Sequence, residues 1–303
     1  MSELDMNLTD LAAFCQVVDS GGFTAAGRVL KERTKQISRR VKRLEDAVGL
    51  PLLHRTTRSV SPTESGRRLY IHASRILNAV SDAARSMAAA PGELRETLRV
   101  AVPTMTVAAG LAEWSTTLQR EHPHLTLAIT VRDGPADVVG EGLDLCITSQ
   151  RPAQSTLLIR RLGTVTVSLA AHVRYIEAYG IPQSAEELVN HRCLLFASEV
   201  LQTHWDLIDP QGHLHSVPVR GALHADNSAL LFEALHAGAG VGLVPPNLLI
   251  EEGEQRGLKP ILPGWSFAPL DLYAVSPPAR RGSKAVDVFI EMIRTGMRDW
   301  WAN

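Results

Sequence analysis

Residues 31 to 43 carry a dense run of basic side chains, with seven lysines and arginines in thirteen positions: Lys31, Arg33, Lys35, Arg39, Arg40, Lys42 and Arg43. Such side chains bind phosphate, and arginine can also donate two hydrogen bonds to the edge of a guanine. A basic run can equally be the solvated face of a surface helix. The neighbouring residues distinguish between these two interpretations.

Apolar residues within this run recur at the helical period. Ile37, Val41, Leu44 and Val48 are spaced i, i+4, i+7 and i+11, which predicts a helix over residues 35–48 with one apolar stripe packed inward. The opposite side of that helix collects the polar and basic residues Lys35, Ser38, Arg39, Lys42 and Arg43. Gly49 suits the left-handed position that follows a helix end.

Two shorter helices are expected before the basic one. Leu8, Leu11 and Phe14 share one face of a helix that ends at Gly21-Gly22. Thr24 can then cap a short helix in which Ala25, Ala26 and Gly27 permit close approach of a neighbour. The order predicts a helix-turn-helix whose second helix can enter the major groove of DNA.

The segment after the basic helix reads as a small two-stranded wing followed by a helix start at Ser61-Pro62-Thr63-Glu64. The pattern F..V...GGFTAAG..L......IS..V..LE..VG..LL.RTTRSVSPTESG, over about residues 8–68, resembles the winged helix-turn-helix of LysR-type transcriptional regulators. Gly22, Gly27, Leu53 and Pro62 depart from the residues usual in that family. Arg33-Thr34-Lys35 replaces the usual Ser-Gln-Ser/Pro, so the family's base preference is not transferred.

The expected DNA contacts fall into two groups. Thr34, Lys35, Ser38 and Arg39 occupy the first turns of the recognition helix, where base edges are reached, and Arg39 is the best candidate for guanine. Arginines nearby are assigned to phosphate. The full expected set is Thr24, Arg33, Thr34, Lys35, Ser38, Arg39, Arg40, Arg43, Arg55 and Arg58.

Charge is divided unevenly along the 303 residues. Residues 1–90 carry 14 basic and 9 acidic side chains, a net charge of +5, and the remainder carries 17 and 23, a net charge of −6. The 45% hydrophobic and 21% charged fractions are typical of globular proteins, and the length favours two or more domains. This asymmetry suggests a head that binds a polyanion, joined to a body with another role.

A long helix is expected from Thr63 to about Ala89. Its apolar residues alternate by four and three positions, as in a coiled coil: Leu69, Ala73, Ile76, Val80, Ala83 and Met87. The stripe can join two chains or pack on its own body. The family resemblance implies a homodimer through this linker helix, often assembled further into a homotetramer.

After Pro91-Gly92 the chain alternates strands and helices, which predicts an α/β fold with parallel sheets covered on both faces. The expected strands are 98–102, 125–131, 143–148, 164–171, 193–196, 240–245 and 270–276. The expected helices are 105–121, 135–141, 173–179, 228–237 and 283–298. The resemblance implies a two-lobed effector domain like periplasmic binding proteins. The expected division is 1–62 for the winged head, 63–92 for the linker and 93–303 for the effector domain, with lobe I at 97–163 plus 269–303 and lobe II at 164–268.

A small ligand in such a body binds at the carboxyl ends of strands, near helix N-termini that favour anions. The matching positions are Pro103, Thr104, Met105, Thr106, Thr148, Arg151, Phe196, Ser198, Asp226, Asn227, Ser228, Val244 and Pro245. Arg151 can pair with a carboxylate, so the expected effector includes carboxylate-bearing molecules. Asp226 opposes an anion unless it serves as a helix cap.

Other residue patterns exclude some chemistry. Cys15, Cys146 and Cys193 are few, odd in number and far apart, which favours reduced thiols in the cytoplasm, with a redox pair as the alternative. His213 and His215 lack further ligands, so a polar hairpin is expected rather than a metal site. Gly238, Gly240 and Gly242 close a helix and open a strand, the reverse of a dinucleotide-binding loop. No secretory signal or membrane-spanning apolar run is present in the sequence.

The leading interpretation is a ligand-responsive, sequence-specific DNA-binding transcriptional regulator, with DNA, an effector and, as a further candidate, RNA polymerase as partners. No cofactor is expected. Two alternatives stay open: a metabolic α/β enzyme with a basic head that localises it on DNA, and a nucleoid protein indifferent to sequence. The sequence lacks GxSxG, P-loop and HExxH motifs, so no enzyme activity is expected.

Overall fold

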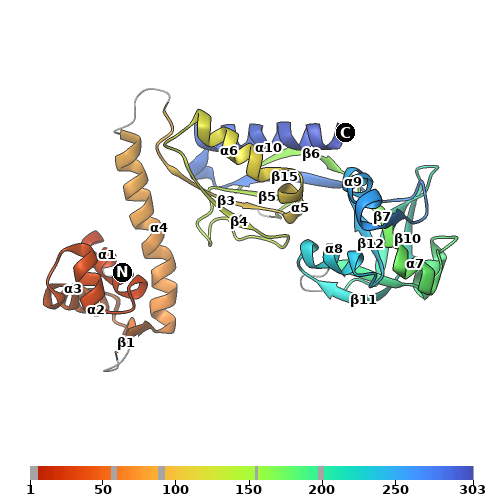
Figure 1. Cartoon of the computed structure of the whole chain (residues 1–303). Helices are drawn as coiled ribbons and strands as arrows, with labels where there is room; N and C mark the ends of the chain where they lie inside the picture. The colour runs from red at the N-terminus through yellow and green to blue at the C-terminus, as the bar shows by residue number, and fades with distance from the viewer. Residues whose placement is uncertain (1–5, 56–59, 88–92, 154–155, 197–200, 303) are drawn as a thin grey trace. The chain divides into compact units, whose positions relative to one another are not determined.

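The computed structural model describes residues 6–55, 60–87, 93–153, 156–196 and 201–302 (Figure 1). The chain forms two compact units, residues 1–96 and 97–303. In the described part of the chain, no helix has the length and apolar character needed to cross a bilayer.

The first unit is a winged helix-turn-helix with a long helix appended. It contains α1 (Leu8–Asp19), α2 (Phe23–Leu30), α3 (Thr34–Val48), β1 (Leu53–Arg55), β2 (Val60–Pro62) and α4 (Glu64–Met87). Strands β1 and β2 pair antiparallel. Phe14, Ile37, Val41 and Leu44 are buried in one core, so the expected apolar stripe of the basic helix is confirmed.

The turn before α3 depends on close backbone approach. A Cβ atom on Gly27 would lie 2.8 Å from the Glu32 carbonyl oxygen, which confirms the expected role of this glycine. The expected cap at Thr24 is wrong, because α2 already begins at Phe23 after Gly22, and no side chain caps it. Helix α3 ends as expected, with Gly49 in the left-handed conformation at φ 74°.

The second unit begins with a mixed sheet in the order β4-β3-β5-β15-β6, which we call lobe I together with helices α5, α6 and α10. Its strands are β3 (Thr97–Val102), β4 (Thr126–Val131), β5 (Leu145–Thr148), β6 (Leu158–Val165) and β15 (Leu270–Ser276). Its helices are α5 (Thr104–Ala108), α6 (Leu111–Glu121) and α10 (Lys284–Ala302). Helices α6 and α10 lie side by side on the sheet (Figure 1).

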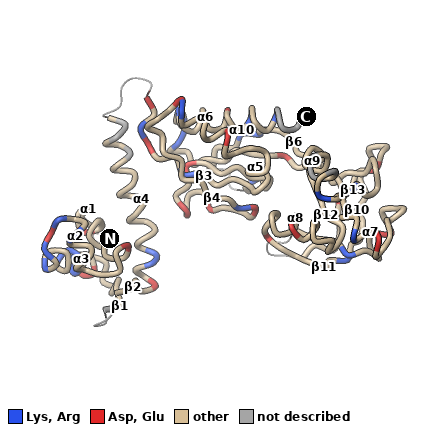
Figure 2. Tube along the Cα trace, viewed as in Figure 1, with Lys and Arg blue, Asp and Glu red and all other residues tan. Residues whose placement is uncertain are grey.

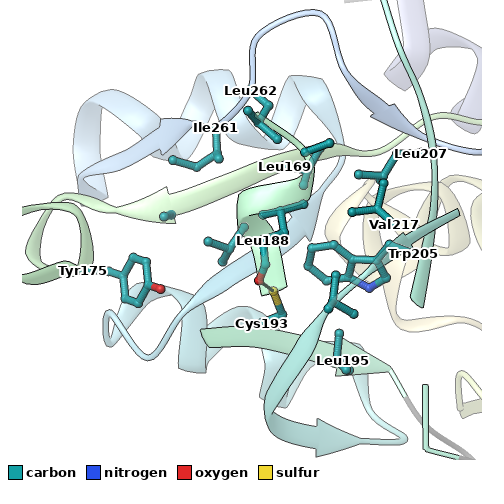
Figure 3. Close-up of a cluster of buried hydrophobic side chains, with 14 residues drawn as sticks. Leu169, Tyr175, Leu188, Cys193, Leu195, Trp205, Leu207, Val217, Ile261 and Leu262 are labelled. Atoms are coloured by element: carbon teal, nitrogen blue, oxygen red, sulfur yellow. Dashed lines mark hydrogen bonds between the residues drawn. The ribbon is translucent and has the colours of Figure 1, made fainter. Parts of the chain in front are cut away.

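Lobe II is built on an eight-stranded sheet, in the order β10-β9-β14-β7-β12-β8-β11 with β13 paired to β7. The strands are β7 (Ser168–His172), β8 (Arg192–Phe196), β9 (His204–Ile208), β10 (Leu214–Pro218), β11 (Arg220–Ala225), β12 (Val241–Val244), β13 (Leu258–Pro260) and β14 (Ser266–Phe267). Helices α7 (Val173–Tyr179), α8 (Ser228–His236) and α9 (Pro246–Arg256) complete it. Figure 3 shows Trp205 beside Leu207 and Val217 in the buried cluster of this lobe.

Both sheets are mixed, so the predicted parallel pairing is confirmed for part of each sheet only. In lobe I, β3 runs parallel to β4 and β5, but β15 runs antiparallel to β5 and β6. In lobe II, β8 is parallel to β11 and β12, whereas β7 is antiparallel to β12. The antiparallel strands β6, β7, β14 and β15 adjoin the two places where the chain passes from one lobe to the other, between Val165 and Ser168 and between Phe267 and Leu270.

Three predicted elements differ from the structure. The helix expected at 105–121 is broken into α5 and α6, because Gly110 takes φ 115° between them. The segment 135–141 forms turns instead of a helix, with the Asp137 carboxylate accepting a hydrogen bond from the Gly140 amide at 2.6 Å. The strand expected at 164–171 spans the end of β6 and most of β7.

Candidate functional site

The outer face of α3 presents the basic residues that the sequence indicates. Arg33, Thr34, Lys35 and Arg39 are exposed at and near its N-terminus, and Ser38 is partly exposed. Figure 2 shows the Lys and Arg positions gathered at α3 and the turn before it. In the described part of the chain, Arg33, Lys35 and Arg39 form no ion pair. These three cations are therefore available to a polyanion.

Two arginines of the predicted DNA contacts are held within the head. Arg43 donates two hydrogen bonds to the buried Asp10 carboxylate of α1, at 3.0 Å from Nε and 2.6 Å from Nη2. Hydrogen bonding to Asp10 raises the pKa of the Arg43 guanidinium. Arg40 pairs with Glu32 at 2.9 Å. Both pairs fix the orientation of α3, a role that sequence reasoning did not assign to them.

The ion pair to Asp10 gives a test of that role. We expect Arg43→Ala to lower the unfolding midpoint of the head, because a buried carboxylate without its partner is costly. Lys42→Ala, one residue away and exposed, is the matched control and should leave the midpoint unchanged. The unfolding midpoint of each variant is measured by heating the protein, with hydrogen exchange of peptides from the head as the probe. Equal midpoints for the two variants would show that the pair does not stabilise the head.

The wing lies directly after α3 and is tied to it. The Glu45 carboxylate accepts hydrogen bonds from the amides of Leu52 at 2.9 Å and Leu53 at 3.3 Å. The backbone of Arg55 ends β1, and Arg58 lies outside the described residues. The predicted wing is confirmed in its described strands.

Helix α4 divides its apolar stripe between two environments. Ala73 is buried and Leu69 partly buried against the head core, whereas Ile76, Val80 and Met87 are exposed. The first turns of the stripe therefore pack on the head, and whether the rest joins two chains or packs on the body stays a prediction. The remainder presents apolar side chains outward.

Two of the predicted effector positions, Thr104 and Ser228, meet at one carboxylate, that of Asp133 after β4. It accepts hydrogen bonds from the amide and hydroxyl of Thr104, both at 2.8 Å. It also accepts from the amide of Ser228 at 2.8 Å and from its hydroxyl at 2.6 Å. The structure thus brings together Thr104 of lobe I and Ser228 of lobe II. Asp133 was missed, although an acidic residue directly after a predicted strand is a signal for it.

The other predicted effector positions are distributed among structural roles. The buried Thr106 hydroxyl donates to the Pro103 carbonyl at 2.7 Å, and the Thr148 hydroxyl accepts from the Gln150 amide at 3.0 Å. Asn227, and not Asp226, caps α8 by accepting from the Leu230 amide. Of the remaining positions, Met105 and Phe196 are partly buried, Val244 is buried and Arg151 is exposed. Pro245 lies at the start of α9, and Ser198 lies outside the described residues.

The residues considered for metal or redox chemistry have other roles. His213 and His215 lie on the hairpin of β9 and β10, as predicted, and hydrogen bond with Asp209. Burial opposes ionisation of Asp209, but hydrogen bonds from the His213 amide and from both imidazoles outweigh it and lower the pKa of the carboxyl. No metal-binding group of His, Cys, Asp or Glu occurs among the described residues.

The three cysteines and the glycine run are also accounted for by packing. Cys15, Cys146 and Cys193 are free and buried. Burial raises the pKa of the Cys146 thiol to about 11 and that of Cys193 to about 12. Gly238 takes φ 77° after α8, and a Cβ atom on Gly240 would lie 2.3 Å from the Arg192 carbonyl oxygen. The predicted cap and close-packing roles of these glycines are confirmed.

Two family models match this chain. Residues 8–67 match the bacterial regulatory helix-turn-helix protein, lysR family, and residues 91–298 match the LysR substrate binding domain. The chain is a LysR-type transcriptional regulator. Members of this family bind DNA and small-molecule effectors and are oligomeric. The resemblance inferred from the head is confirmed, and it extends to the two-lobed body.

Relatives that match over most of their length support this family membership. The HTH-type transcriptional activator AaeR of Escherichia coli is 31% identical over 268 residues, 88% of this chain and 86% of that protein. CrgA of Neisseria meningitidis, a LysR-type transcriptional regulator of known structure, is 27% identical with a TM-score of 0.59, covering 96% of this chain and 99% of that one. Full-length AphB of Vibrio cholerae, a virulence activator, is 25% identical with a TM-score of 0.60 over 95% and 98% of the two chains.

Proposed function

We propose that this regulator binds duplex DNA as a homodimer, with α3 in the major groove and the exposed stripe of α4 joining two heads. The single observation that carries this proposal is the exposed set of Arg33, Lys35 and Arg39 at the start of a helix whose opposite face packs into the core of the head. One winged head contacts too few base pairs for selectivity, and a dimer doubles the site. Further assembly into a tetramer is part of the proposal.

Within α3 we divide the DNA contacts by position. Thr34, Lys35, Ser38 and Arg39 lie on the outer side of the first turns of α3, and we assign them to base edges, with Arg39 donating to guanine. Arg33, at the helix start, and Arg55 and Arg58 of the wing are assigned to phosphate. Arg40 and Arg43 contribute positive charge while remaining paired to Glu32 and Asp10.

The effector domain is proposed to bind a small molecule between the two lobes near Thr104 and Ser228, with carboxylate-bearing molecules as the first class to test. Arg151 is exposed after β5 and can pair with such a group. Binding there would change the spacing of the paired heads on DNA, with a coupling of about 1–3 kcal/mol. The proposed place of action is the cytoplasm, with RNA polymerase as a partner at the promoter.

The division of base and phosphate contacts predicts different outcomes for two arginines. We expect Arg39→Ala to relax preference at one base position, with a loss of about 1–3 kcal/mol on the preferred sequence. Arg33→Ala should weaken binding about equally on all sequences and reduce the salt dependence by about one charge. Selection of duplexes from a random pool, followed by affinity measurements at several salt concentrations, measures both.

The same experiment separates the competing functions. Equal affinity for selected and random duplex would favour a nucleoid protein indifferent to sequence. Absence of DNA binding would remove the proposed function altogether. If Arg39→Ala and Arg33→Ala behave alike on every duplex, the assignment of base and phosphate contacts is wrong.

A further inference from the structure

The Asp133 carboxylate joins the two lobes of the body by accepting hydrogen bonds from both of them. Its Oδ2 atom accepts three of them, from the Thr104 hydroxyl, the Ser228 amide and the Ser228 hydroxyl. Its Oδ1 atom accepts the fourth, from the Thr104 amide. A carboxylate has about four acceptor positions, two on each oxygen, so donors crowd Oδ2 while Oδ1 keeps one position open.

The donors come from the first residues of two helices in different lobes. Thr104 begins α5 of lobe I, and Ser228 begins α8 of lobe II. Asp133 belongs to lobe I, so the two bonds to Ser228 cross the boundary, and the two bonds to Thr104 hold the carboxylate in place. Hydrogen bonds to an ionised group are roughly twice as strong as neutral ones. The chain crosses between the lobes only at residues 165–168 and 267–270, so these side-chain bonds can control closure.

We propose that Asp133 is an internal anion that clasps the two lobes, taking the contacts that the carboxylate of an effector would make. An anionic effector then has to displace the Asp133 side chain from Ser228. The hydrogen bonds between the lobes are lost when this happens, or the effector takes them over. The regulatory meaning of this clasp rests on the proposed effector function. The clasp itself is a property of the body and is measurable without DNA or effector.

The clasp is tested by distance measurements between the lobes in the full chain. Spin labels are attached at Glu121→Cys, at the exposed end of α6, and at Gln211→Cys, in the exposed turn between β9 and β10. The native cysteines are buried with raised thiol pKa values, so they react slowly with the label. Pulsed electron paramagnetic resonance then gives the distribution of distances between the label on lobe I and the label on lobe II.

With Asp133 intact, we expect one narrow distance. Asp133→Asn should lower the ratio of molecules with closed lobes to molecules with open lobes by about tenfold or more. This change is equivalent to the loss of one hydrogen bond to a charged group. An amide cannot replace the carboxylate, because its NH2 group would face an obligate donor in either orientation, the Thr104 amide at the Oδ1 position or the Ser228 amide at the Oδ2 position. Ser228→Ala should widen the distribution less, since it removes one of the two bonds that cross between the lobes. Asp137→Asn is the matched control, because its carboxylate contacts only lobe I.

Chemical rescue separates loss of the clasp from general damage to the fold. Asp133→Ala should open the lobes, and added formate, which restores a free carboxylate to the same donors, should narrow the distribution again. Formate should narrow the distribution less in Asp133→Ala combined with Ser228→Ala, because only the Ser228 amide is then left to cross between the lobes. An unchanged distance distribution in Asp133→Asn, or rescue that does not depend on Ser228, would overturn the clasp. If the unmodified protein fails to bind DNA or to respond to any effector, the proposed function is contradicted. The distances between the lobes still test the clasp in that case.

Discussion

Val80→Glu is expected to convert the proposed dimer into monomers and to lower the affinity for DNA carrying two half-sites by roughly 100-fold or more. Val80 lies on the part of the α4 stripe that leaves the head core, and its side chain is 48% exposed in the single chain. In a coiled-coil pair, the two copies of such a residue face each other. Two glutamates at this position would place two negative charges side by side in an interface that excludes water. The neighbouring residues of the stripe are apolar and cannot neutralise these charges.

The affinity loss follows from effective concentration. When one head of a dimer is bound, the second head binds as an intramolecular event, which contributes a factor of about 100 to 10,000. Val80→Glu should therefore leave the affinity for a duplex with a single half-site unchanged. Sedimentation gives the particle mass, and titration of both duplexes gives the two affinities.

Ile71→Glu is the matched control on the same helix. Its side chain is 49% exposed, close to that of Val80, but its position is off the alternating series of Leu69, Ala73, Ile76 and Val80. It should remain a dimer with wild-type affinity for both duplexes. A dimer that survives Val80→Glu, or that is lost equally in Ile71→Glu, would place the interface elsewhere on the chain.

The head was predictable because its signals are local. The stripe of Ile37, Val41 and Leu44 indicates a helix and its buried face at once, and Gly49 ends that helix through a conformation that few other residues adopt. Arg43 marks the limit of this reasoning. Its place on the outer face of α3 suggests a DNA contact, and only the folded head shows Asp10 of α1 beside it.

The body was less predictable because its contacts join distant segments. Asp133 and Ser228 are 95 residues apart, and no periodicity in the sequence connects them. Strand β9 has alternating burial at Trp205 and Leu207, which is a readable signal that was missed. Strand β10 has little such signal, since its only buried residue is Val217, and its pairing with β9 defines it.

Gly66→Ala is expected to destabilise the head by about 1–3 kcal/mol, the cost of forcing atoms into a packed interior. Helix propensity alone predicts the opposite sign, because alanine in a helix interior is favoured over glycine by about 1 kcal/mol. A Cβ atom on Gly66 would lie 2.0 Å from the Leu52 carbonyl oxygen, and no rotation of a side chain can relieve a backbone contact. The same carbonyl accepts a hydrogen bond from the Thr63 amide at 2.9 Å, at the start of α4.

Moving α4 away to make room for the methyl group would break that bond and the one from the Thr63 hydroxyl to the Pro51 carbonyl, at 2.8 Å. Hydrogen exchange of the α1 and α3 peptides in the full chain reports on the head separately from the body. We expect faster exchange in Gly66→Ala and unchanged or slower exchange in Ser65→Ala, which raises helix propensity in the same turn without adding an atom. Protection in Gly66→Ala equal to that of Ser65→Ala would mean that the head adjusts to the methyl group at no cost. The contact between Gly66 and Leu52 would then not determine how the linker helix joins the head.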